Sequence, residues 1–166
     1  MRILIPVDGS RAALAPLAHA EQLARQGVSL EVLLVNVQPR MHRHIAQFTR
    51  RADREALRAE RSRVAMTGAI ERLGAAGVPF RAVTEVGRPA ARIAAVAEAQ
   101  GVDEIAMGTG RHPRWMRWVN PSIAERLIDL TDIPVTVLAR GRAGALERYA
   151  IPAGVAGLAA LLIAAE

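Results

Sequence analysis

Short apolar stretches alternate along the chain with longer segments in which apolar positions recur every three or four residues. The short stretches are rich in Val, Ile and Leu with little polar alternation, which is typical of parallel strands buried on both faces. Five of them are predicted to be strands: Ile3 to Val7, Leu30 to Val37, Phe80 to Glu85, Glu104 to Met107 and Pro134 to Ala139.

The segments between these strands have the length and spacing of helices, and glycines or prolines stand where they should stop. Such a βαβαβαβαβ order predicts an α/β domain over residues 1–140, a doubly wound five-stranded parallel sheet with helices on both faces. A ligand site is then expected beyond the carboxyl ends of the strands, where the strand order reverses. The predicted helices are Ser10 to Gln26, Ala46 to Ala75, Pro89 to Gln100 and Ser122 to Leu130.

Residues 141–166 form an apolar tail beyond the last predicted strand, and no charge occurs from Tyr149 to Ala165. That length is at the short limit for a membrane-spanning helix, which needs about 17 to 25 residues. Three hypotheses stay open: an apolar helix packed on the sheet or a partner, a membrane contact flanked by arginines, and a loosely ordered end.

Composition excludes several classes of protein. The 166 residues include no cysteine, which excludes disulfides and iron–sulfur ligation. The net charge of +6 rests on arginine alone, and aromatic residues make up only 3% of the chain, too few for stacking platforms on single strands. We expect no specific nucleic-acid partner. No signal sequence precedes the first strand, so the expected location is the cytoplasm, or the cytoplasmic face of the membrane if the tail anchors there.

Catalytic and metal-binding patterns are not found in the sequence. His42 and His44 lack a nearby carboxylate pair and predict no metal site. There is no lysine for a phosphate-binding loop and no nucleophile elbow, so the chain is not expected to be an enzyme. His19 falls inside the first predicted helix and is interpreted as a surface or packing residue.

The stretch with the strongest functional signal begins where the fourth predicted strand ends. Met107 is followed by the turn Gly108-Thr109-Gly110-Arg111, and after a basic loop Ser122 is placed to cap the next helix. A glycine turn followed by a helix start can present backbone N–H groups to a phosphate.

Together with Ile5-Pro6-Val7-Asp8-Gly9-Ser10 and Val86-Gly87-Arg88-Pro89, this stretch resembles the universal stress protein family. The nucleotide signature of that family is Gly-x2-Gly-x9-Gly-Ser/Thr. Gly108 matches its first glycine and Ser122 its hydroxyl residue. Arg111 and Pro121 occupy the second and third glycine positions, and Gly110 is the alternative match for the second.

The resemblance implies the adenine nucleotide alpha hydrolase-like fold and a regulatory role in stress response. It implies ATP or another adenine nucleotide as ligand, with or without Mg²⁺, and at most slow hydrolysis. It also implies a homodimer through Pro134 to Ala139 and a further, unidentified protein partner. The nucleotide site carried over to this sequence consists of Pro6, Asp8, Val37, Met107, Gly108, Gly110, Arg111, Ser122 and Ile123.

The departures from the signature leave two functional hypotheses. Pro121 has no N–H to offer a phosphate, and Arg111 brings a bulky side chain but also a charge. The chain either binds a nucleotide in spite of these two departures or is a nucleotide-free dimeric interaction module.

Asp8 also has two interpretations, a nucleotide contact or an Asx-turn before the first helix. A turn into a helix that starts with proline explains Gly87, and helix packing is favoured for Trp115 and Trp118.

Overall fold

The computed structural model describes residues 1–40, 50–108, 123–138 and 150–151, and their strands form one sheet in the order β3-β2-β1-β4-β5-β6. Five strands run parallel, as the sequence predicts. They are β1 (Arg2–Pro6), β2 (Glu31–Gln38), β3 (Phe80–Val86), β4 (Glu104–Gly108) and β5 (Val135–Leu138).

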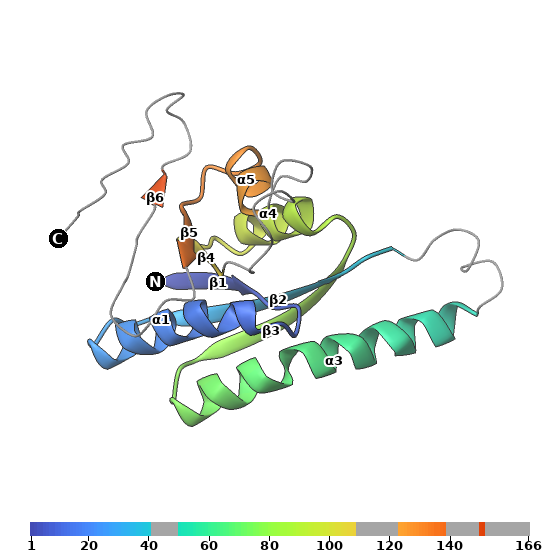
Figure 1. Ribbon diagram of the computed structural model, residues 1–166, viewed down its shortest axis with the longest axis horizontal. Coiled ribbons are helices and arrows are strands. Elements are labelled where there is room, and N and C mark those ends of the chain that lie inside the picture. Colours follow the sequence, from blue (N-terminus) through green and yellow to red (C-terminus); the bar gives the residue numbers. More distant parts are fainter. Residues whose placement is uncertain (41–49, 109–122, 139–149, 152–166) are drawn as a thin grey trace.

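Two helices cover each face of this sheet (Figure 1). On one face lie α1 (Leu14–Arg25), preceded by the short 3-10 turn η1 (Arg11–Ala13), and α3 (Arg51–Ala75). On the other lie α4 (Pro89–Ala99) and α5 (Ile123–Ile128). The side chains of each strand point alternately into these two layers, which explains why the strands have few polar positions.

The alternation divides the hydrophobic core into two clusters. Ile3, Ile5 and Leu34 are fully buried toward α1 and α3, where they meet Leu17 and Leu73. The cluster on the other face is formed by Leu4, Leu33, Ile93, Ile105 and Leu127. Burial of apolar area on this scale is the main stabilising contribution to such a fold.

A sixth strand, β6 (Ala150–Ile151), was not predicted. It pairs antiparallel with β5, Ala150 opposite Thr136 and Ile151 opposite Val135. These two residues lie in the tail for which an apolar helix packed on the sheet or a partner was one of three hypotheses, and they form a strand. The rest of the tail lies outside the described residues. None of the helices in the described ranges is long and apolar enough to cross a membrane.

Candidate functional site

The candidate site lies where the order of strands reverses, between β1 and β4. These two strands are neighbours in the sheet, but their connections leave in opposite directions, β1 toward β2 and β4 toward β5. Such a switch point separates the loops at the carboxyl ends of the strands and leaves room for a ligand. Pro6 ends β1 and Gly108 ends β4 at this edge.

Asp8 lies in the turn that follows β1. Its side chain is exposed, and its Oδ1 accepts a hydrogen bond from the backbone N–H of Ser10 at 2.9 Å. This is the Asx-turn that the sequence offered as one interpretation. Within the described residues the other carboxylate oxygen, Oδ2, has no hydrogen-bond partner. The turn therefore fixes the carboxylate and leaves one oxygen available to a ligand.

Gly9 and Ser10 complete the turn and start the helical segment. Gly9 has a φ of +81°, a conformation that residues with a Cβ rarely adopt. Ser10 caps η1, since its Oγ accepts a hydrogen bond from the N–H of Ala12 at 3.2 Å. The predicted first helix thus begins as a 3-10 turn, which brings the backbone of Ala12 to β4.

Gly108 is the residue of β4 that this backbone meets. A Cβ at Gly108 would overlap the carbonyl group of Ala12. Only a glycine allows the end of β4 and η1 to approach so closely. Gly108 therefore has a packing role that is independent of any phosphate, and it joins the β1 and β4 sides of the candidate site.

Three apolar residues of the predicted site share one face of the sheet. Pro6 and Met107 follow the alternation of Leu4 and Ile105, and Val37 follows Leu33 and Val35, all toward α4 and α5. Val37 and Met107 pack at the border of this cluster and are only partly buried. Together the three form an apolar patch beside Asp8.

Ile123 begins α5, where 42% of its surface is exposed. Gly110, Arg111, Pro121 and Ser122 lie outside the described residues, as do His42, His44, Trp115 and Trp118. Among the described residues no cluster of His, Asp and Glu could hold a metal ion.

Two residues important for the site were missed in the sequence. Asn36 is buried in β2, its Nδ2 donates to the carbonyl of Val7 at 2.6 Å, and its Oδ1 accepts from Gln38 Nε2 at 2.6 Å. These bonds tie the chain after β1 to β2. In the sequence, the feature that could have pointed to Asn36 is that it is the only amide within an apolar run. Arg11 begins η1, shortly after Asp8 in the chain, and its side chain is exposed.

His19 and Gly87 fit their structural interpretations. His19 is buried on α1, 3.8 Å from Glu104 Oε1, and is a packing residue. The N–H of Gly87 donates to the Gln38 carbonyl, and Pro89 is the first residue of α4.

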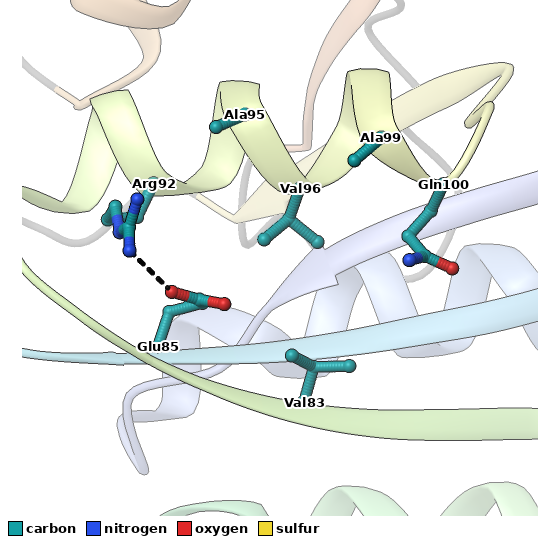
Figure 2. Close-up of a pocket in the computed structure, with 7 residues that line it drawn as sticks. All are labelled: Val83, Glu85, Arg92, Ala95, Val96, Ala99 and Gln100. Atoms are coloured by element: carbon teal, nitrogen blue, oxygen red, sulfur yellow. Dashed lines mark ion pairs between the residues drawn. The ribbon is translucent and has the colours of Figure 1, made fainter.

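A separate pocket of about 250 Å³ lies between β3 and α4 (Figure 2). Val83 and Val96 point toward one another across it, and Arg92 pairs with Glu85 at 3.2 Å. This pocket lies over β3, two strands away from β1, and is not part of the candidate site.

The family model for the universal stress protein family matches residues 1–139. The chain belongs to the universal stress protein family. A search of curated proteins found no match.

Solved structures of the same fold include the hypothetical protein MJ0577, with 26% identity, a TM-score of 0.67 and coverage of 86% of this chain and 97% of that one. A family protein from Arabidopsis thaliana, solved with AMP bound, has 13% identity, a TM-score of 0.62 and coverage of 85% and 92%. A universal stress protein in complex with cAMP has 17% identity, a TM-score of 0.62 and coverage of 83% and 96%. At these low identities, the similarity to the last two structures establishes a shared fold and nothing more.

Proposed function

We propose that this universal stress family protein binds an adenine nucleotide between β1 and β4 and that the bound state regulates a protein partner. The observation that carries the proposal is that η1, which directly follows the Asp8 turn, packs against Gly108 at the end of β4, beside the patch of Pro6, Val37 and Met107. An apolar patch next to a few placed polar groups is the usual composition of a small-ligand site. That two family structures contain AMP and cAMP supports the choice of ligand.

Roles follow from the chemistry of each group. The apolar patch suits the flat, apolar faces of an adenine ring, and the Asp8 carboxylate suits the hydroxyl or amino donors of an adenosine. Arg11 offers a charge to the phosphates from the β1 side. The proposed site also includes residues that follow β4 in the chain: Gly110, Arg111, Ser122 and Ile123. ATP is the first candidate ligand, with Mg²⁺ as its companion. Hydrolysis is expected to be slow at most.

The first test is the nucleotide content of the purified chain, measured by chromatography with mass detection after denaturation. Calorimetric titration of emptied protein with ATP, AMP and cAMP then gives the affinities. Stoichiometric adenine nucleotide, or saturable binding of any of the three, is the expected result. Protein that is purified empty and binds none of them contradicts the proposal.

Substitutions of Asp8 separate its two roles. Asp8→Ala removes both the carboxylate and the Asx-turn, whereas Asp8→Asn keeps the Oδ1 acceptor for Ser10 N–H. If the carboxylate contacts the nucleotide, both variants lose affinity by about tenfold or more. If Asp8→Asn binds normally, Asp8 acts only through the turn. Glu98→Ala, on an exposed position of α4, is the matched control.

Pro121→Gly tests the departure from the family signature directly. The substitution restores a backbone N–H at the position where the signature has its third glycine. Nucleotide affinity is expected to rise, with a larger gain for ATP than for adenosine because the new donor would face phosphate. An unchanged ratio between these two ligands would argue against a phosphate contact at this position.

A second candidate is a nucleotide-free interaction module, and it is favoured by one observation. Close packing against Ala12 is sufficient to explain Gly108, so this glycine does not require a phosphate. In that case a homodimer through Pro134 to Ala139 would carry the function, but β6 already occupies the edge of β5 at Val135 and Thr136. Deletion of residues 150–166 would then strengthen dimerisation.

Deletion after Arg142, with fractionation of cells, tests a membrane contact of the tail.

A further inference from the structure

The N-terminal half of α3 is largely exposed to solvent. The buried residues of this helix all lie in its C-terminal half: Ser62, Met66, Ala69 and Leu73. Before Ser62 the helix continues for about 16 Å, and in Figure 1 this part extends past the end of α1. Among the described residues, none between positions 51 and 61 is fully buried. The exposed half of α3 therefore offers a helical surface that the sheet does not cover.

This surface starts beside the turn of the candidate site. A Cβ at Gly9 would lie 3.3 Å from the Cα of Ala65, so α3 touches the turn that carries Asp8. Ser62 and Thr84, near the end of β3, are hydrogen-bonded through their hydroxyl groups. Because a helix that connects two parallel strands runs back against them, the residues before Ser62 lie at and beyond the carboxyl edge of the sheet. The exposed half of α3 is thus a neighbour of the candidate site.

Three arginines form a row on this half of the helix. Arg54, Arg58 and Arg61 follow one another at spacings of four and three residues, which puts them on one helix face together with Ala65. In the described part of the chain, neither Arg58 nor Arg61 pairs with an acidic side chain, and Arg58 Nε has no hydrogen-bond acceptor. The face that touches Gly9 therefore continues outward into a row with two cations available to a partner.

Two apolar side chains lie beside the arginine row. Leu57 is 40% exposed and Val64 is 61% exposed, and they are seven residues apart. A spacing of seven residues keeps apolar side chains on one seam of a helix, which is how one helix packs against another. Both are neighbours of Arg61 on the helix surface, at spacings of four and three residues. Apolar and cationic contacts are therefore offered together.

The charges around this seam favour an acidic protein over other partners. On its other side lie Asp53 and Glu60, which would repel a phosphate surface such as a nucleic acid or an anionic membrane. Two apolar side chains are also too few for insertion into a membrane. A second copy of α3 would match the arginine row poorly, because Glu60 is already bound to Arg63 at 2.6 Å. A helix with an apolar seam flanked by Asp or Glu complements the surface.

We propose that the exposed half of α3 is the docking surface for an acidic amphipathic helix of a partner protein. Carboxylates of the partner pair with Arg58 and Arg61, and its apolar side chains pack on Leu57 and Val64. Docking rests on the proposed function in one respect, that a protein partner exists, and it requires no nucleotide. The docked helix would lie next to the turn of Asp8, where the nucleotide is proposed to bind.

Two double variants with the same change in net charge test the arginine row. Arg58→Gln/Arg61→Gln removes its two available cations. The matched control, Arg51→Gln/Arg63→Gln, removes two arginines of the same helix that already bind acidic side chains. The probe is a fluorescent synthetic helix of about 20 residues, with leucine in a heptad seam and glutamate beside it. Fluorescence anisotropy at physiological salt is expected to show saturable binding to the wild type, binding about tenfold weaker to the first variant, and little change in the control.

The apolar seam and the sign of the charge are tested separately. Leu57→Ala keeps a good helix former at an exposed position, so the fold should be unchanged, while affinity for the probe should fall about threefold or more. A second probe, with lysine in place of glutamate, is expected not to bind the wild type. Circular dichroism of every variant confirms that lost binding is not a lost fold.

Four results would overturn the proposal. The glutamate probe could fail to bind, or both double variants could lose affinity equally, which would indicate attraction by net charge alone. Duplex DNA or phosphatidylserine vesicles could bind more tightly than the probe and depend on Arg58 and Arg61. Sedimentation velocity could show that a second copy of the chain occupies the surface. All samples are first emptied of nucleotide, so a failure to bind ATP and a failure to bind the probe are separate results.

Discussion

Gly108 at the end of β4 lies against Ala12 in η1 so closely that a Cβ at position 108 would overlap the Ala12 carbonyl. This contact joins the two sides of the switch point. It also gives the first glycine of the family signature a structural reason that holds with or without a nucleotide.

Gly108→Ala is predicted to destabilise the fold by about 2 kcal/mol or more, because a rigid backbone carbonyl is in the way and η1 has to move. Gly68→Ala is the opposite control. Gly68 is an exposed residue inside α3, a Cβ there meets nothing within 4 Å, and alanine is expected to stabilise the helix by about 1 kcal/mol. Urea unfolding of both variants measures the difference. Equal effects at the two positions would contradict the close contact.

Asn36→Leu is predicted to cost about 2 kcal/mol, because it leaves the carbonyl of Val7 without the Asn36 amide that donates to it. Gln38→Ala removes only the outer member of the network and should cost less. If Asn36 also positions the turn at Asp8, nucleotide affinity falls in Asn36→Leu at temperatures where the variant is still folded. Thermal unfolding and titration calorimetry test the two effects separately.

Stability should depend on pH through Glu31. The hydrogen bond from Arg2, together with the nearby charge of Arg81, holds the pKa of the Glu31 carboxyl below its ordinary value of 4.5. A lowered pKa in the folded state stabilises the fold above pH 4.5, and this contribution disappears as the pH falls through the lowered pKa. The wild type should therefore be more stable than Glu31→Gln at neutral pH and lose that advantage in acid.

The check is urea unfolding of both proteins between neutral pH and acid, with Glu98→Gln as a control that carries no ion pair in the described chain. High salt should reduce the difference, because Glu31 is accessible to solvent. A difference that persisted at low pH would show that the Glu31 side chain acts through packing.

Arg72 of α3 and Glu21 of α1 form a two-pronged ion pair between the helices on one face of the sheet. The Glu21 side chain is only 11% exposed, so the pair is better shielded from water than the other ion pairs of α3. A double-mutant cycle with Arg72→Met and Glu21→Gln is expected to give a coupling energy of about 1 kcal/mol. The same cycle on Arg51 and Glu55, an exposed pair, should give less.

The sequence by itself determined the architecture. Runs such as Leu30 to Val37, apolar without alternation, can only be strands covered on both faces, and the helices between them require parallel crossovers. Strand ends were predicted to within about one residue, and the switch point followed from the order of elements. Asp8 and Gly108 were placed correctly at that edge because the carboxyl ends of parallel strands share it.

Only the tertiary structure decided which groups meet. Gly108 was read as part of a phosphate turn, and its contact with Ala12 depends on how η1 approaches β4, a distance that no local pattern encodes. Asn36 appeared to be an ordinary strand residue until the Val7 carbonyl was found beside it. The pairing of β6 with β5 joins residues far apart in the chain, whereas periodicity reports only on neighbours within a turn or two. For the same reason the arginine row of α3 could be placed beside the Asp8 turn only once the helix was packed on the sheet.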